Sequence, residues 1–264
     1  MHIEKRWLIT GVSSGIGEAL AKAALKRGDI VFGSAREQDA IAAFEALEPG
    51  RAFGLQLDVT NPKNVKAAVD ETLERGPLDV VVANAGQSIF GAFEETSIEE
   101  AKALLDVNLF GAWALAQAVL PHFRGRGKGQ LVHVSSGCGL NGTPGLSAYS
   151  ASKFALEGFS EALALEVAQF GVDLLIVEPG AVSSRFISKG TTETTKRLPE
   201  YSFLSGQGKA ALDGYYASCA MEPGKVADAI MAAIEDPAHP RRVLVGDDVR
   251  NPVRTKAEHL LALA

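Results

Sequence analysis

The sequence contains only two cysteines, Cys138 and Cys219, which form no CxxC pair and have no histidine at metal-ligand spacing. A disulfide framework or a zinc site is therefore not expected. We expect the protein to occupy a reducing compartment such as the cytoplasm. Basic residues are not in excess either, because 26 lysines and arginines face 32 acidic residues, for a formal net charge of −6. Nucleic-acid-binding proteins usually present a basic face, so we expect no nucleic-acid partner.

Long apolar runs are also missing. No uninterrupted run is long enough to span a bilayer, and the first residues, MHIEKRWLITG, lack the regions of a signal peptide. These features predict a cytoplasmic protein without a membrane partner. The 264 residues, of which 47% are hydrophobic and 22% charged, can bury a sizeable core and are expected to form one domain, residues 1–264.

Short segments rich in Val, Ile and Leu alternate with longer helical patterns. Because the apolar segments lack a clean two-residue alternation, they are typical of parallel strands covered on both faces. Strands are predicted at 6–10, 29–35, 51–59, 78–86, 130–136, 172–180 and 241–248, and helices at 15–28, 37–47, 61–76, 97–123, 147–171 and 223–236. Asn61 and Pro62 supply a cap and a first-position proline for one helix. The pattern predicts an α/β fold, a doubly wound parallel sheet of Rossmann-like type.

Residues 183–221 interrupt the alternation with a segment rich in Thr, Ser and Gly that also carries aromatic residues. The segment follows a predicted strand, and open α/β sheets bind ligands beyond the carboxyl ends of their strands. We interpret it as a lid or substrate loop. An insertion that is merely tolerated is the alternative.

The first predicted strand leads into TGVSSGIG, residues 10–17, and then into a helix. Gly11, Gly15 and Gly17 permit a tight turn and let a pyrophosphate approach the backbone at the helix N-terminus. The spacing GxxxGxG differs from the common GxGxxG, and many such turns use glycine only for packing. The strand before it and the helix after it favour a dinucleotide site.

Tyr149 and Lys153 stand four residues apart near the start of the predicted helix 147–171. That spacing places a phenol and an ammonium on one helix face. The ammonium favours the phenolate and is expected to lower the tyrosine pKa from about 10 toward the range useful for proton transfer. A surface pair without a chemical role is the alternative.

Six motifs occur in a fixed order, and together they resemble those of the short-chain dehydrogenase/reductase family over residues 5 to 185. They are TGVSSGIG, NAG at 84–86, VNLFG around Asn108, VSSG at 134–137, YSASK at 149–153 and PGAVSS at 179–184. The resemblance implies an oxidoreductase that interconverts an alcohol and a ketone or aldehyde by hydride transfer with a nicotinamide cofactor. It also implies a small-molecule carbonyl or alcohol as substrate.

Four catalytic residues follow from this resemblance. Tyr149 is the general acid/base and Lys153 its electrostatic partner, while Ser136 orients the substrate and Asn108 supports a water relay. Ser136 ends a predicted strand, and the thirteen-residue step to Tyr149 lets both hydroxyls reach one carbonyl oxygen. His133, by contrast, has no role in the family pattern and is expected to be packed.

The resemblance also implies where the cofactor lies. Asp58 and Val59 would flank the adenine, and Pro179, Gly180 and Val182 would lie beside the nicotinamide. The full implied set is Gly11, Ser13, Ser14, Gly15, Ile16, Gly17, Ala35, Arg36, Asp58, Val59, Asn84, Ala85, Gly86, Tyr149, Lys153, Pro179, Gly180, Val182 and Ser184. Ser184 stands where the family often has threonine, and a serine hydroxyl can form the same hydrogen bond.

The sequence GSAREQ at the end of the second predicted strand favours NADP(H). Enzymes that prefer NAD typically place a carboxylate there to bind the ribose 2′-hydroxyl. Here Ala35 is followed by Arg36, whose guanidinium suits a 2′-phosphate, and Ser34 adds a hydroxyl. Glu37 is adjacent, so Arg36 could instead belong to a solvated helix start, with NAD(H) as the alternative cofactor.

Aromatic residues of the insertion, together with Ile89 and Phe90, predict a moderately apolar substrate pocket. Members of the family commonly pair long helices, and the alanine-rich 97–123 and 147–171 predict a homodimer or homotetramer. A non-catalytic NADP(H)-binding regulator is one alternative, although such proteins usually lack the tyrosine or lysine. A related nucleotide-sugar epimerase or dehydratase is another, although those chains tend to be longer.

Overall fold

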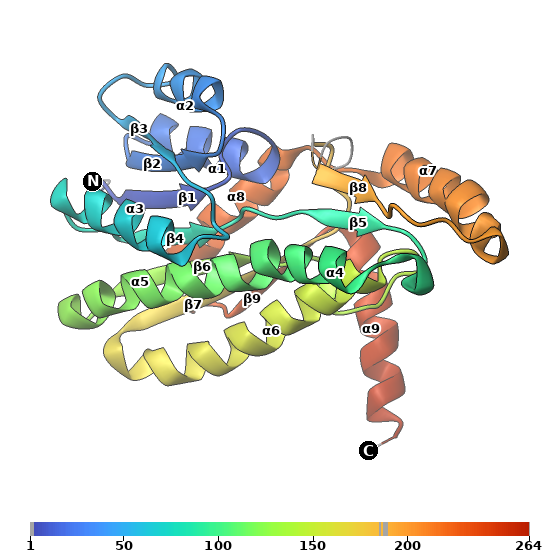
Figure 1. Cartoon of the computed structure of the whole chain (residues 1–264). Coiled ribbons are helices and arrows are strands. Elements are labelled where there is room, and N and C mark those ends of the chain that lie inside the picture. Colours follow the sequence, from blue (N-terminus) through green and yellow to red (C-terminus); the bar gives the residue numbers. More distant parts are fainter. Residues whose placement is uncertain (1–2, 185, 187–189, 264) are drawn as a thin grey trace.

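Seven parallel strands form the central sheet in the order β3-β2-β1-β4-β6-β7-β9 (Figure 1). This computed structural model describes residues 3–184, 186 and 190–263, so residues 185 and 187–189 of the predicted insertion lie outside the described part. The strands are β1 (Arg6–Thr10), β2 (Ile30–Ala35), β3 (Ala52–Gln56), β4 (Val80–Ala83), β6 (Gly129–Val134), β7 (Val172–Pro179) and β9 (Arg242–Val245). The strand order reverses between β1 and β4, the place where open α/β sheets bind ligands. The predicted doubly wound sheet is confirmed.

Helices cover both faces of the sheet (Figure 1). On one face lies a core cluster that includes Leu115, Phe123 and Leu156, and on the other a cluster that includes Leu20 and Ile230. The helices in these layers are α1 (Gly15–Lys26), α2 (Gln38–Glu45), α3 (Pro62–Glu74), α5 (Gly111–Arg126), α6 (Ser147–Val167) and α8 (Pro223–Glu235). All four residues of β4 are buried, which explains why the strands read as continuous apolar runs. As predicted, the Asn61 side chain caps α3.

The predicted helix 97–123 is interrupted. It consists of α4 (Ile98–Leu105), a π-helical turn over Asp106–Phe110, and α5. The stretch from Ile98 to Arg126 is apolar and long enough to cross a bilayer by composition alone. However, its α5 part packs against α3 and supplies the core with fully buried residues such as Val119, as a core helix does.

Four elements were not predicted. The short strands β5 (Ser88–Phe90) and β8 (Thr191–Glu193) pair in parallel and form a second sheet. Within the insertion, α7 (Lys209–Cys219) follows β8, and after the last strand α9 (Asp247–Leu261) extends away from the body (Figure 1). The described part of the insertion is therefore a structured unit beside the ends of the strands.

His133 on β6 is packed, as predicted. Its side chain is 1% exposed, and its Nδ1 lies 2.7 Å from the Ser160 hydroxyl oxygen. That hydroxyl donates to the Leu156 carbonyl, so the ring nitrogen is the donor to the serine oxygen. Burial, the largest cause, and the charge of Lys153 lower the pKa of His133 to about 4.

Because the pKa of His133 is about 4 when folded and 6.5 when unfolded, the unfolded chain binds more protons between these values. Stability is then lost as the pH falls through that window. We expect this group to lower the free energy of unfolding by about 2 kcal/mol between pH 7 and pH 5. Urea unfolding at both pH values should show the loss in wild type and in the surface control His259→Gln, and a loss smaller by about 2 kcal/mol in His133→Gln. Equal losses in all three proteins would contradict the assignment.

Candidate active site

Tyr149 and Lys153 are both buried on α6, with 7% and 4% of their surfaces exposed. The Lys153 ammonium donates to the carbonyl oxygen of Val134, the last residue of β6, at 2.8 Å. The same nitrogen lies 5.9 Å from the centre of the Tyr149 ring. The pair is thus buried at the end of a central strand, and the alternative of a surface pair is wrong.

Ser136 lies two residues beyond the end of β6 rather than ending the strand as predicted. Ser136 caps a 3-10 turn, Gly137–Gly139, because its hydroxyl accepts a hydrogen bond from the Cys138 backbone N–H at 3.1 Å. The Ser136 side chain also lies close enough to Tyr149 to lower the pKa of its phenol. The structure therefore brings the two hydroxyls together, as the sequence predicts.

Asn108 lies in the π-helical turn and is 2% exposed. Its Nδ2 donates to the Gln87 carbonyl and to the Ser152 hydroxyl, each at 2.9 Å, and its Oδ1 accepts from the Gln87 N–H at 2.9 Å. A Cβ on Gly86 would lie 3.3 Å from Asn108 Oδ1 and 3.8 Å from Lys153 Nζ. Asn108 thus links the loop after β4 to α6 beside Lys153, and such π-turns often occur at functional sites.

The pKa of Tyr149 departs from the sequence-based expectation. Burial is the largest influence and raises the phenol pKa above its ordinary value; Cys138 also raises it, while the hydrogen bond with Ser136 opposes them. Burial also lowers the pKa of Lys153 to about 8, opposed mainly by Glu157. The expected net lowering of the Tyr149 pKa is therefore not found in the chain by itself, because burial dominates the shift. The phenol is held protonated.

The turn between β1 and α1 has the backbone that a pyrophosphate site requires. Gly11 and Gly15 adopt φ angles of +76° and +65°. A Cβ on Gly17 would overlap the Gly11 carbonyl oxygen and lie 2.5 Å from Asn84 Nδ2, so only glycine permits this approach of helix and turn. Ser14 starts α1 without a side-chain cap, which leaves the first-turn N–H groups available to an anion. The turn fits a dinucleotide.

Thr10 ties this turn to the end of β4. Its hydroxyl donates to the Val82 carbonyl at 3.2 Å and accepts from the N–H groups of Asn84 and Ala85 at 3.0 and 3.1 Å. The Asn84 amide in turn donates to the carbonyls of Thr10 and Gly11 at 2.8 and 3.1 Å. The role of Thr10 was not predicted, although a hydroxyl residue between a strand and a glycine turn is a usable signal in the sequence.

At the ends of β2 and β3, Arg36 and Asp58 are exposed and Ala35 is buried. Hydrogen bonds from Thr60 are the main cause that lowers the Asp58 pKa, and the charge of Arg36 lowers it further. Arg36 and Asp58 therefore lie near one another, as residues at one end of a cofactor would. Ser34 is buried, with 1% of its surface exposed, and a contribution of its hydroxyl to cofactor choice stays a prediction.

The segment after β7 reaches the glycine turn. A Cβ on Gly15 would lie 3.1 Å from the Ser184 Cβ, and beside this contact is a cavity of about 390 Å³. Asp248 of α9 accepts hydrogen bonds from the Ala181 N–H at 2.8 Å and the Tyr215 hydroxyl at 2.6 Å. The position of Asp248 was not predicted, because nothing in the local sequence pattern shows that α9 returns to this loop.

The remaining predicted positions follow the same edge of the sheet. Val59 lies against Gly111 at the start of α5, since a Cβ on that glycine would come within 3.0 Å of it. Pro179 ends β7, and the N–H of Gly180 donates to the Val245 carbonyl at 2.9 Å. Val182 forms an isolated β-bridge with Met221.

Two further predicted positions lie in the turn before α1 and at its start. Ser13 is exposed, and Ile16 is half-buried in the first turn of α1.

Apolar side chains surround Tyr149 on the side of the insertion. The buried members are Ile89, Phe90, Leu104, Leu146 and Tyr149, and the partly buried ones are Cys138, Ala148, Phe186, Leu204 and Leu212. This cluster agrees with the predicted apolar pocket. Not every predicted aromatic belongs to it, because Phe203 is 61% exposed.

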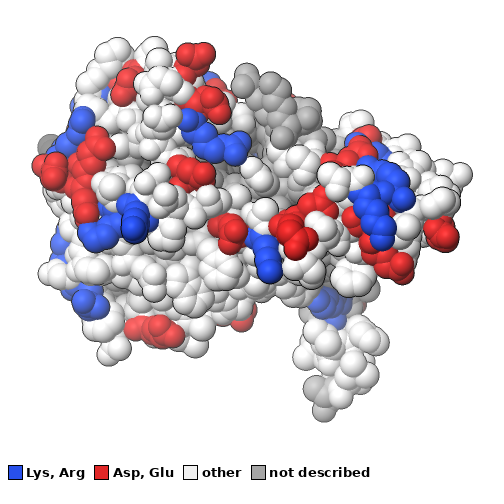
Figure 2. Space-filling view, viewed as in Figure 1, with Lys and Arg blue, Asp and Glu red and all other residues white. Residues whose placement is uncertain are grey.

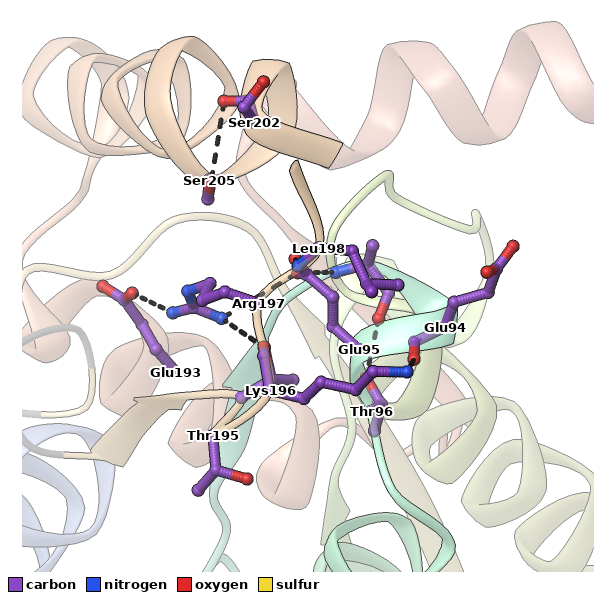
Figure 3. Close-up of polar contacts among 12 residues, drawn as sticks. Glu94, Glu95, Thr96, Glu193, Thr195, Lys196, Arg197, Leu198, Ser202 and Ser205 are labelled. Atoms are coloured by element: carbon purple, nitrogen blue, oxygen red, sulfur yellow. Dashed lines mark hydrogen bonds and ion pairs between the residues drawn. The ribbon is translucent and has the colours of Figure 1, made fainter. Parts of the chain in front are cut away.

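The insertion is attached to the segment before α4 (Figure 3). Glu95, only 1% exposed, accepts hydrogen bonds from the N–H groups of Leu198 at 2.9 Å and Ala92 at 3.1 Å. Lys196 donates to the Glu94 carbonyl at 3.3 Å, as the close-up shows. These contacts hold the start of the insertion beside the strand ends, as a substrate loop requires.

Comparison with known proteins agrees with this architecture. A family profile described as short chain dehydrogenase matches residues 5–195. A short-chain dehydrogenase structure from Streptomyces avermitilis superimposes with a TM-score of 0.91 and 38% identity, over 99% of this chain and 95% of that one.

Two curated relatives are similar over most of their lengths. "Oxidoreductase BOA17" of Botryotinia fuckeliana is 35% identical over 98% of this chain and 94% of its own. Human 17-beta-hydroxysteroid dehydrogenase type 1 is 35% identical over 87% of this chain and 74% of its own. The chain therefore belongs to the short-chain dehydrogenase/reductase family, which uses nicotinamide cofactors, and is an oxidoreductase acting on CH–OH or C=O groups.

Proposed function

We propose that the protein is an NADP(H)-dependent oxidoreductase that interconverts a moderately hydrophobic alcohol and its ketone or aldehyde. The observation that carries this proposal is the buried Tyr149 phenol, which lies near the Ser136 side chain and next to the Lys153 ammonium. These groups lie at the same strand ends as the glycine turn. Because all of them are present, nothing favours a non-catalytic regulator on this fold.

The bound cofactor supplies or accepts the hydride. In the reducing direction, the Tyr149 hydroxyl donates its proton to the substrate oxygen, and the high pKa of the buried phenol keeps that proton available. Ser136 supplies a second hydrogen bond to the same oxygen and polarises the carbonyl. The Lys153 ammonium then stabilises the phenolate. Asn108 holds the loop after β4 through its hydrogen bonds with Gln87 and so supports the water relay that returns a proton to Tyr149.

The chain's own residues also provide for the cofactor. Gly11, Gly15 and the free N–H groups at the start of α1 would hold the pyrophosphate. Arg36, exposed at the end of β2, would bind a ribose 2′-phosphate, since its guanidinium suits a phosphate and no carboxylate ends that strand. Asp58 would lie at the adenine end. This choice of NADP(H) over NAD(H) rests mainly on Arg36.

The apolar cluster around Tyr149 supports a hydrophobic substrate, and the similarity to a hydroxysteroid dehydrogenase points the same way. On the face in Figure 2 acidic and basic side chains are interspersed, which suits a small-molecule substrate better than a polyanion.

Four large apolar residues on or beside α5 and α6 are 40–64% exposed, namely Phe110, Trp113, Phe154 and Leu165. Such a surface supports the homodimer or homotetramer expected from these helices. We further propose that the protein acts in the cytoplasm, as the sequence features predict.

Tyr149→Phe should lower turnover by about 10³-fold, because it removes the proton donor from the site. Its affinity for NADPH, measured by fluorescence titration, should stay within about threefold of wild type, which is less than 1 kcal/mol. Tyr201→Phe is the matched control, because Tyr201 lies in the insertion and its hydroxyl donates a hydrogen bond to Glu94. Near-normal turnover of Tyr149→Phe with any carbonyl substrate would defeat the proposed role.

Arg36→Ala should weaken NADPH binding by about tenfold or more and leave NADH binding nearly unchanged, because the lost contact is to the 2′-phosphate. Binding of both cofactors to the apoprotein, measured by calorimetry, separates the two effects. Arg254→Ala, which removes an exposed arginine of α9, is the control for general charge. Equal losses for NADPH and NADH would show that Arg36 does not select the cofactor.

A further inference from the structure

A cluster of charged side chains lies between α6 and the β7–β9 edge of the sheet. Arg242 of β9 donates from Nη1 to Glu157 at 2.7 Å and also to Glu178, and from Nη2 to Glu161. Glu157 is 5% exposed and Glu178 is fully buried, whereas the side chain of Glu161 is 63% exposed. One guanidinium therefore serves three carboxylates, two of them inside the protein.

This cluster is not well explained as a contribution to stability. Glu157 Oε1 and Glu178 Oε2 are buried without a hydrogen-bond partner among the described residues, and so is the Ser135 hydroxyl oxygen. Burial, followed by the charge of Glu157, raises the pKa of Glu178 to about 7. Buried carboxylates with unsatisfied oxygens are costly, and apolar residues in their place are often as stable or more so. The cluster therefore calls for another role.

Glu157 follows Lys153 by one turn of α6, so the carboxylate and the ammonium share a helix face. Other groups that face the lysine are Tyr149 from the same helix, His133 from β6 and Cys138 from the 3-10 turn. None of these three is a carboxylate. Among these described groups Glu157 is the carboxylate, and its charge raises the pKa of Lys153 more than Cys138 does.

We propose that Glu157, oriented by Arg242, is a positioning residue that keeps Lys153 protonated beside Tyr149. The proposal rests on the proposed function, in which the charge of Lys153 stabilises the phenolate. Arg242 lies outside the matched family region, residues 5–195, and reaches α6 only because β9 joins the sheet next to β7. Without Glu157, the effect of burial on the ammonium would be opposed less strongly, which would favour loss of its proton near neutral pH.

The direct test is the titration of Lys153 in the apoprotein. With lysine labelled at 13Cε, the resonance that disappears in Lys153→Met belongs to this residue, and its shift against pH gives the pKa. In wild type the midpoint should be near pH 8. In Glu157→Gln it should fall by about one pH unit, because the compensating charge is removed while side-chain size is kept.

Two further variants serve as controls. Glu161→Gln removes the exposed carboxylate on Arg242 and should leave the Lys153 titration unchanged, whereas Glu157→Asp keeps the charge and should restore most of the wild-type value. Circular dichroism checks that each variant is folded. An unchanged Lys153 pKa in folded Glu157→Gln would overturn the proposal.

Activity then separates this proposal from the proposed function. If the Lys153 pKa falls in Glu157→Gln, the alkaline limb of the kcat/KM profile with NADPH should move down with it. A lowered pKa with an unchanged pH profile would support the role of Glu157 in setting the charge, and would instead contradict the role given to Lys153 in turnover.

Discussion

The site depends on a lysine ammonium that is held inside the protein. Burying a positive charge is unfavourable unless hydrogen bonds and opposite charge compensate it. Here the last carbonyl of β6 accepts one hydrogen bond from Lys153, and Glu157 lies one turn away. This arrangement requires α6 to cross the end of β6, and the same crossing places Tyr149 next to Ser136. The position of α6 against the end of β6 therefore determines both the burial of Lys153 and the placement of Tyr149.

The two sides of the site are organised differently. On the cofactor side, Thr10 and Asn84 join the glycine turn to β4 through backbone hydrogen bonds, so the surface is made largely of main chain. On the substrate side, the insertion is held through the carboxylate of Glu95 and forms an apolar wall near Tyr149. A backbone cradle suits a constant cofactor, while side chains on an insertion can vary with the substrate.

The sheet, most helix positions and the central groups of the site could be predicted because they follow from local pattern. Apolar runs without alternation predicted buried parallel strands, and the order of the motifs placed Tyr149, Lys153 and Ser136 in one family scheme. The sequence could not predict features that depend on distant contacts. Asp248 reaches Ala181 from 67 positions away, and the pairing of β5 with β8 joins segments separated by the whole middle of the chain. The Tyr149 pKa was misjudged for the same reason: the pattern shows the nearby lysine but not the depth of burial.

The central claim is that the chain alone keeps the Tyr149 phenol protonated and that positive charge from oxidised cofactor, added to Lys153, makes its ionisation accessible. The direct measurement is the ultraviolet absorbance of tyrosinate against pH, with and without oxidised cofactor, taken as the difference between wild type and Tyr149→Phe. We expect no ionisation of Tyr149 in the apoprotein below about pH 10 and a midpoint lower by about two units or more in the complex. A midpoint that is the same in both states would contradict the account.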